Sequence, residues 1–196
     1  MMKKKKQEQF VPTLEELERE IARTKYRKNY QKTLRGTIGV LITVAAIAVL
    51  VATLLLPVLQ IYGTSMTPTL ENGEIVLSLK ETDFQKHDIV AFYYNNKILV
   101  KRVIARAGEW VNIDADGNVS VDGKPLDEPY VQDLALGECD IALPYQVPEG
   151  RLFVMGDHRS VSVDSRSSSV GCVADEQIVG KLFFRIWPLS RFGAVE

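Results

Sequence analysis

Three segments of the sequence combine residue types that can carry out nucleophilic chemistry. The first is GTSMTPTL at residues 63–70, which contains Ser65. The small residues Gly63 and Thr64 leave space beside this serine, and Pro68 stiffens the chain after it. A serine hydroxyl becomes a nucleophile when a neighbouring base takes its proton. Taken alone, the segment is more typical of a serine in an ordinary turn, so the chemistry needs a base from elsewhere in the chain.

A candidate base lies in the second segment, KILVKRVIARAGE at residues 97–109. Side chains alternate between the two faces of a β-strand, so Lys101 and Arg102 point to opposite faces that are otherwise apolar. We therefore expect one of these charges to be poorly hydrated. Burial lowers the pKa of a lysine, and a neutral lysine can accept a proton, which arginine cannot. The alternative is a lysine whose ammonium reaches solvent at a sheet edge.

The third segment is MGDHRSVSVDSRSSSVG at residues 155–171, which is dense in charged and hydroxyl side chains. Its candidate functional residues are Asp157, Arg159, Ser162, Asp164 and Arg166. Paired aspartates and arginines brace a loop through bidentate hydrogen bonds. The same composition also fits a solvated surface loop, but this segment connects two predicted core strands.

The elements that must position these segments are β-strands. Short runs rich in Val, Ile and aromatic residues are typical of strands, and DADGN and VDGK between them favour turns. The predicted strands are EIVLSL (74–79), DIVAFYY (88–94), KILVKRVIA (97–105), EWVNI (109–113), NVSV (118–121), RLFVMG (151–156) and QIVGKLFFRIWP (177–188). The sequence therefore predicts a mainly β fold, with one antiparallel β domain at residues 59–196.

A charge-free run of 35 residues, 36–70, ends with the first of these three segments. Its first 21 residues, 36–56, are long enough as a helix to span a hydrocarbon core of about 30 Å, and Pro57 marks the expected end of the helix. A buried core helix is the alternative, but cores rarely need such a long uncharged run. A cleaved signal peptide is disfavoured for two reasons. The 35 residues before the run are long for the basic start of a signal peptide, and the run itself is longer than the usual apolar region of one. We therefore predict one transmembrane helix at residues 36–58.

The net charge of -1 conceals an asymmetry along the chain. Residues 1–35 carry eleven Lys and Arg against five Asp and Glu, which places this side in the cytoplasm and the β domain outside the cell. Within this cytoplasmic segment, residues 13–33 are expected to form a helix, with Thr13 and Glu16 at the spacing of a capping box. The basic run at residues 3–6 is expected to be a tail near anionic lipid headgroups.

Composition also excludes several function classes. The charge balance argues against a nucleic-acid partner. With only two histidines and two cysteines in the chain, a Cys/His zinc module of the usual four-ligand kind is not expected. On the oxidising side of a membrane, Cys139 and Cys172 either form one disulfide or remain two separate thiols, and the sequence does not distinguish these states.

The three segments, in this order and after a membrane anchor, resemble the type I signal peptidase family over about residues 40–188. SMTP is similar to the family's segment around its nucleophile, which implies that Ser65 has that role. VKRVI matches the segment of the general base, which implies Lys101. GDHRSVSVDSR is similar to the family's third motif, which implies that Ser162 orients the lysine. In that match Asp157, Asp164 and Arg166 brace the site.

The sequence departs from the family's pattern at two informative places. His158 stands where the family commonly has Asn, which raises a serine–histidine site as a weaker alternative. Gly63 stands where some members have a hydroxyl residue that helps to form the oxyanion hole. The Ser65 backbone N–H is still expected to donate, and the second donor is either the Gly63 backbone or Thr64.

The resemblance implies a membrane-anchored serine endopeptidase of coiled-sheet, barrel-like form that removes signal peptides from exported preproteins without a metal or cofactor. It implies substrates with small residues at positions -3 and -1, and shallow apolar pockets next to the serine. The residues expected to line these pockets are Ile61, Ile75, Val76, Leu99 and Val100. Two alternatives remain: a processing peptidase dedicated to one client such as a pilin, and an inactive membrane-tethered binding module.

Overall fold

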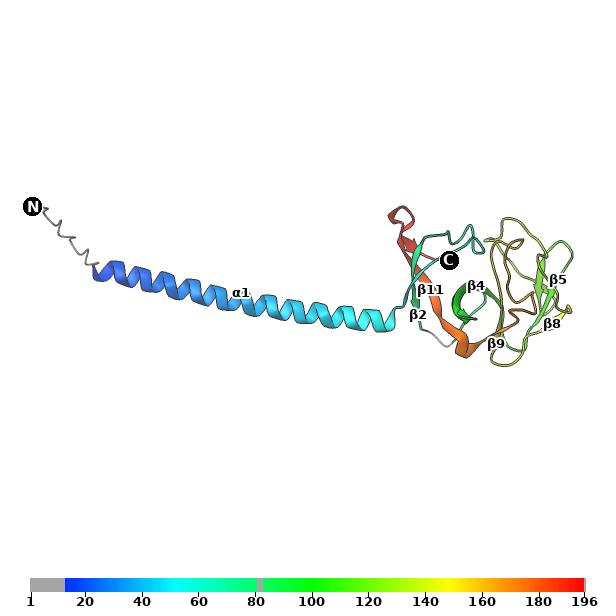
Figure 1. Ribbon diagram of the computed structural model, residues 1–196, viewed down its shortest axis with the longest axis horizontal. Helices are drawn as coiled ribbons and strands as arrows, with labels where there is room; N and C mark the ends of the chain where they lie inside the picture. The colour runs from blue at the N-terminus through cyan, green and yellow to red at the C-terminus, as the bar shows by residue number, and fades with distance from the viewer. Residues whose placement is uncertain (1–12, 81–82, 196) are drawn as a thin grey trace, which may run out of the picture. The chain divides into compact units, whose positions relative to one another are not determined.

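The computed structural model describes residues 13–80 and 83–195, and the basic run at residues 3–6 lies outside this part. The chain divides into two units, residues 1–51 and residues 52–196. Figure 1 shows helix α1, which makes up the described part of the first unit and ends just inside the second, and the β-strands of the second unit.

Helix α1 extends over Leu14–Leu55, so the two helical segments predicted from the sequence are continuous, but the helix ends three residues before the predicted boundary at residue 58, which belongs to a strand. At its start the Thr13 N–H donates to Glu16 Oε2 at 3.0 Å, which is one of the two bonds of a capping box. The helix ends two residues before Pro57, where the proline ring disfavours a further helical residue. Its most apolar 18-residue window has a mean hydropathy of 2.2 and is exposed throughout, so the helix is long and apolar enough to cross a membrane.

Most strands of the second unit belong to one large antiparallel sheet. In pairing order its strands are β1 (Val58–Gln60), β2 (Ile75–Leu79), β11 (Ile178–Trp187), β3 (Ile89–Tyr94), β4 (Lys97–Ala105), β9 (Arg151–Met155) and β10 (Val173–Ala174), and β12 (Gly193–Ala194) pairs with β11. β1 and β10 lie at opposite ends of this order, so the predicted barrel-like form is not confirmed.

A second antiparallel sheet is built from short strands. Its order is β7 (Lys124–Pro125), β6 (Val119–Val121), β5 (Trp110–Ile113) and β8 (Tyr145–Gln146). Two short 3₁₀ helices, η1 (Asp175–Gln177) and η2 (Leu189–Arg191), flank β11. The mainly β, antiparallel fold class predicted from the sequence is confirmed, and each of the seven predicted strands is present with ends shifted by no more than one residue.

Strand β4 is the element that carries the second chemical segment into the core. It pairs with β3 on one side and β9 on the other, so its backbone is hydrogen-bonded along both edges. Its side chains contribute to three apolar clusters among the described residues of the domain. Ile104, Val100 and Val103 each pack in a different one of these clusters. A strand held in this way gives its two buried polar side chains, Lys101 and Arg102, fixed positions.

Candidate active site

Ser65 lies in the turn-rich segment between β1 and β2. The segment is tied to the core by Met66 and Leu70, which are both buried, and by a hydrogen bond from the Leu70 N–H to the Met66 carbonyl at 2.9 Å. A second turn is closed by the Thr67 N–H, which donates to the Thr64 carbonyl at 3.1 Å. Ser65 itself is half-buried, so its hydroxyl is accessible while its backbone is fixed.

Lys101 reaches this serine from the interior of β4. Its Nζ lies 2.7 Å from Ser65 Oγ, although the residues are 36 positions apart in the sequence. Lys101 is only 3% exposed, which excludes the alternative of a lysine that extends to solvent at a sheet edge. The structure therefore brings together the predicted nucleophile and the predicted base at hydrogen-bonding distance.

Burial lowers the pKa of Lys101 below its ordinary value of 10.5, because desolvation disfavours the ammonium form. The negative charges of Asp164 and, more weakly, Asp157 oppose this shift, whereas the positive charge of Arg166 adds to it. Because burial is the largest effect, the net direction is toward a neutral amine that can accept a proton.

The third segment folds around an internal ion pair. Arg166 Nε and Nη2 lie 2.8 and 2.9 Å from the two carboxylate oxygens of Asp164, and both side chains are completely buried. Asp164 also accepts the Gly156 N–H at 2.9 Å, and Arg166 donates to the carbonyls of Arg159 and Ser162. This pair fixes the loop and offsets the carboxylate charge that would otherwise favour a protonated Lys101.

A second buried pair joins the third segment to β4. Arg102 binds Asp157 through two parallel hydrogen bonds, from Nε at 2.9 Å and from Nη2 at 2.7 Å. Its Nη1 donates to the His87 carbonyl at 2.8 Å, and its guanidinium lies 3.9 Å from the centroid of the Tyr130 ring. The adjacent strand residues Lys101 and Arg102 therefore both contribute to the region, one at the serine and one at the supporting loop.

Ser162 lies in the same region but does not make the expected contact with Lys101. Its Oγ is buried and has no hydrogen-bond partner among the described residues. A Cβ atom at Gly156 would collide with Ser162 Oγ and with the Ser65 carbonyl oxygen, so the absence of a side chain there lets the third segment approach the serine closely. The structure thus places the Ser162 hydroxyl beside the Ser65 backbone and leaves it unpaired.

His158 contacts the serine segment, but its imidazole binds Thr67 and not the Ser65 hydroxyl that a serine–histidine site requires. Its Nδ1 lies 3.0 Å from Thr67 Oγ1, and its backbone N–H donates to the Ser65 carbonyl at 3.1 Å. The Ser65 hydroxyl instead has Lys101 as its neighbour. This geometry favours the serine–lysine interpretation over the serine–histidine alternative.

The two predicted sources of a second oxyanion donor differ in availability. The Gly63 N–H already donates to Asn72 Oδ1 at 3.0 Å. Among the described residues, the Ser65 N–H and the Thr64 hydroxyl have no hydrogen-bond acceptor. Thr64 is therefore the better candidate for the second donor, and Asn72 is a site residue that the sequence did not reveal.

A groove of about 410 Å³ opens beside Ser65 and Lys101. Of the residues expected to line it, Ile61, Leu99 and Val100 do so, whereas Ile75 and Val76 do not. Val76 is fully buried in the core. The lining residues that the sequence analysis missed are Leu59, Gln60, Tyr62, Met66, Lys97 and Ile98. They come from β1, the segment after it and the start of β4, which the sequence alone did not place next to one another.

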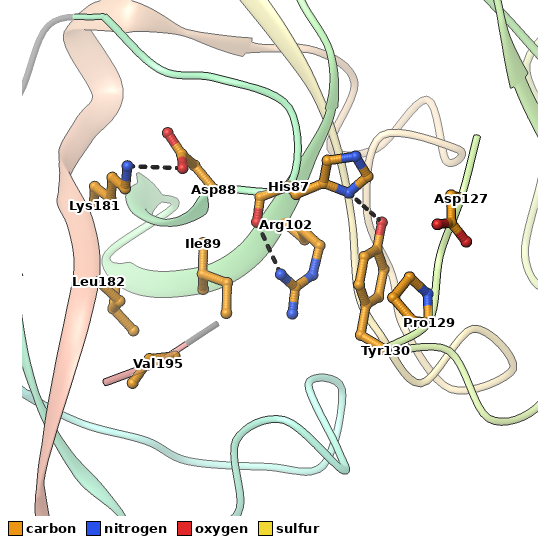
Figure 2. Close-up of a pocket in the computed structure, with 10 residues that line it drawn as sticks. All are labelled: His87, Asp88, Ile89, Arg102, Asp127, Pro129, Tyr130, Lys181, Leu182 and Val195. Carbon is orange, nitrogen blue, oxygen red and sulfur yellow. Dashed lines mark hydrogen bonds and ion pairs between the residues drawn. The ribbon is translucent and has the colours of Figure 1, made fainter. Parts of the chain in front are cut away.

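A second cavity of about 530 Å³ lies next to Arg102. Figure 2 shows the His87 ring facing the Tyr130 hydroxyl, the His87 carbonyl facing Arg102, and Lys181 facing Asp88. These polar groups bind one another at 2.8 to 3.2 Å. In this larger cavity these polar groups are engaged with one another, and the Asp127 carboxylate also lines the wall. The groove instead has the Ser65–Lys101 pair at its wall.

The cysteines are separate thiols in the structure. Cys139 is half-buried and Cys172 is buried, and both are free. Burial raises the pKa of the Cys172 thiol to about 11, so this side chain is a protonated, weakly reactive thiol at neutral pH.

Residues 34–187 match the family described as signal peptidase, peptidase S26, a span of more than half of the chain. The chain belongs to this family. It is similar to signal peptidase IB of Staphylococcus aureus, with 38% identity over 152 residues that cover 67% of this chain and 78% of that protein. It is also similar to signal peptidase I of Bacillus caldolyticus, with 39% identity over 161 residues that cover 72% of this chain and 87% of that protein.

A solved structure is also similar to the chain, the crystal structure of a signal peptidase I from Enterococcus faecalis V583. It is 32% identical, covers 51% of this chain and 97% of its own chain, and superposes with a TM-score of 0.43. The sequence matches bear out the resemblance to the signal peptidase family inferred from the three segments, and all three segments lie within the matched residues.

Proposed function

We propose that this chain is a membrane-anchored serine endopeptidase that removes signal peptides from preproteins, with Ser65 as nucleophile and Lys101 as general base. The observation that carries this proposal is the 2.7 Å contact between Lys101 Nζ and Ser65 Oγ at a lysine whose pKa is lowered by burial. Membership of the signal peptidase family supports the substrate class.

The chemistry is acyl transfer in two steps. Neutral Lys101 takes the proton of the Ser65 hydroxyl while Oγ attacks the carbonyl carbon of the residue before the cleavage point. The protonated lysine then gives its proton to the amine of the mature protein as the peptide bond breaks. In the second step Lys101 takes a proton from water, the resulting hydroxide attacks the acyl ester, and Ser65 recovers its hydroxyl proton as the signal peptide leaves.

Two donors are proposed for the oxyanion that forms during each attack. The Ser65 N–H is one, and the Thr64 hydroxyl is the other because the Gly63 N–H is engaged with Asn72. In other serine hydrolases one such donor contributes about 2.7–4 kcal/mol to transition-state stabilisation. We keep Ser162 as the proposed orienting group for Lys101 although the structure shows no hydrogen bond between them. A buried hydroxyl without a partner is costly, and a hydrogen bond to Lys101 would remove that cost.

The groove accounts for the proposed substrate preference. Apolar side chains such as Ile61, Leu99 and Val100 line it close to the reacting pair. An extended peptide with small residues at positions -3 and -1 would bury both without displacing these walls. The bracing pairs of Asp157 with Arg102 and of Asp164 with Arg166 keep the groove's catalytic side rigid.

The decisive experiment uses the purified full chain in detergent or vesicles with a preprotein substrate, followed by N-terminal sequencing of the product. Cleavage after a small residue at the signal-peptide boundary supports the proposal, and Ser65→Ala should abolish it while substrate binding persists. An inactive wild-type chain that still binds preprotein would instead indicate a binding module. A panel of unrelated preproteins separates a general peptidase from one dedicated to a single client.

The proposed topology places residues 1–35 in the cytoplasm and the β unit outside, with α1 in the lipid bilayer. Its basis is the charge asymmetry before residue 36, and it would place Ser65 only about nine residues past Leu56, where a signal peptide leaves the membrane. Protease added outside intact cells should digest residues 60–196 and spare the N-terminal segment. Protection of the β unit under these conditions would contradict the topology.

A further inference from the structure

We propose that the imidazole of His158 is a positioning group for the backbone N–H of Ser65, acting through two neighbouring threonines. The inference rests on the proposed role of Ser65 and concerns a side chain that does not contact the Ser65 hydroxyl. His158 is therefore a positioning residue in this proposal, and Lys101 remains the base.

The direction of the hydrogen bonds follows from their distances. Thr67 Oγ1 lies 2.8 Å from the Thr64 carbonyl oxygen, which can only accept, so the single hydroxyl proton of Thr67 is donated there. Thr67 Oγ1 also lies 3.0 Å from His158 Nδ1. Because its proton is already engaged, the threonine oxygen accepts from the imidazole, and Nδ1 carries the hydrogen. The chain of donors therefore runs from His158 to Thr67 to the Thr64 carbonyl.

The Thr64 carbonyl belongs to the same peptide group as the Ser65 N–H. This carbonyl accepts both the Thr67 hydroxyl and the Thr67 N–H, at 2.8 and 3.1 Å, which fixes the plane of the peptide. Hydrogen bonds to an amide carbonyl polarise the amide, and bonds in a chain strengthen one another. The Ser65 N–H is thereby aimed and made a stronger donor before any oxyanion forms.

The other peptide group of Ser65 is held by the His158 backbone. The His158 N–H donates to the Ser65 carbonyl at 3.1 Å, so one residue pins both peptides that flank the nucleophile. This second contact does not depend on the side chain and survives substitution. A change at position 158 therefore isolates the contribution of the imidazole.

The test compares His158→Asn with His158→Leu in the full chain. Asn places an N–H donor on the atom corresponding to Nδ1, whereas Leu has nearly the same shape as Asn and no donor. We expect His158→Leu to lower kcat about tenfold, less than the about 100- to 1,000-fold loss on deleting an oxyanion donor, with KM within about twofold of wild type. His158→Asn should restore kcat to within about threefold of wild type.

A second matched pair tests the intermediate link. Thr67→Val removes the hydroxyl with little change of shape, and Thr67→Ser keeps it, so only the valine variant should lose kcat. Because both residues act through one chain of hydrogen bonds, Thr67→Val combined with His158→Leu should lose no more than about the larger single effect. Thermal unfolding of each variant shows whether a loss of activity arises from unfolding.

The outcomes separate this inference from the proposed function. Retained activity in Ser65→Ala would overturn the proposed function and this inference with it. An inactive Ser65→Ala together with an unchanged kcat in His158→Leu overturns the inference alone. Equal losses in the Asn and Leu variants, a change confined to KM, or fully multiplicative effects in the double variant would also overturn it.

Discussion

Lys101 and Arg102 are neighbours on the same strand, both are basic residues, and both are almost completely removed from solvent, at 3% and 2% exposure. Their surroundings differ. Arg102 is bound by both oxygens of Asp157 and faces the ring of Tyr130 in the larger cavity (Figure 2). Lys101 has no carboxylate within ion-pairing distance among the described residues and ends at the Ser65 hydroxyl.

The difference shows how one strand supplies both a structural cation and a base. A buried guanidinium stays charged and is stabilised by a carboxylate with matching geometry. A buried amine without such a partner relieves the cost of desolvation by losing its proton. Of the neighbouring carboxylates, Asp164 raises the pKa of Lys101 most. Because Asp164 is paired with Arg166, it opposes deprotonation of the lysine less than an unpaired carboxylate would.

The largest expected effect comes from exchanging the lysine for a group that keeps its charge. Lys101→Arg cannot shed a proton, so it should lose at least about 1,000-fold in kcat/KM, as much as Lys101→Ala. The measurement is cleavage of one preprotein by both variants, with folding checked by circular dichroism. Substantial activity in Lys101→Arg would show that the position needs only a cation and would remove the proposed mechanism.

Replacing Arg102 should mainly lower the stability of the fold, in contrast to the loss of activity expected at Lys101. Arg102→Met leaves the Asp157 carboxylate buried without its partner, which should lower the free energy of unfolding by about 3–5 kcal/mol. Arg102→Lys keeps one charge contact but loses the bidentate geometry and should be intermediate. Denaturant unfolding of the β unit within the full chain measures both. The matched control is Arg106→Met, an exposed arginine just beyond the strand, which should change stability by under about 0.5 kcal/mol.

The pH dependence of kcat tests the protonation state that distinguishes the two residues. Activity requires neutral Lys101, so kcat should rise with pH along a limb whose midpoint is the lowered pKa of Lys101, below 10.5. The profile is measured with saturating preprotein over the range in which circular dichroism shows an unchanged fold. A midpoint at or above 10.5 would mean that Lys101 is solvated as an ordinary lysine during turnover.

The sequence was sufficient for the parts of the molecule that depend on local pattern. Runs rich in Val, Ile and aromatic residues identified seven strands, and the uncharged run identified the apolar helix. Placing Lys101 and Arg102 on a strand with otherwise apolar faces predicted that one of the two charges would be poorly hydrated, but it left open a lysine that reaches solvent. The structure buries both residues. The strands β1, β7, β8, β10 and β12 were missed because two or three residues carry little pattern of their own and are fixed by their partners. The equally short β6 was recognised because turn signals lie on both sides of it.

Contacts between distant irregular segments could not be predicted in the same way. Tyr130 lies in a long stretch without regular strands, so nothing in the sequence indicates that its ring covers Arg102. The bond from the Gly63 N–H to Asn72 depends on the three-dimensional course of the turn after Ser65. Ser162 shows the opposite case, because the motif predicted a bond to Lys101 and the structure leaves its hydroxyl unpaired.

The smallest expected effect concerns the cost of keeping a base in the core. Lys101→Met fills the same space without a group that must be desolvated, so the inactive variant should be more stable than wild type by about 1 kcal/mol at neutral pH. Because the folded protein binds fewer protons than the unfolded chain between the lowered pKa of Lys101 and 10.5, wild-type stability rises with pH through that window. The advantage of the methionine variant should therefore be largest below the window and shrink as pH rises through it. Denaturant unfolding at several pH values measures this, with the exposed Lys97→Met on the same strand as the control that should show no such trend. A methionine variant less stable than wild type at every pH would mean that Lys101 stabilises the fold as Arg102 does. The contrast between Lys101 as a base and Arg102 as a structural cation would then be wrong.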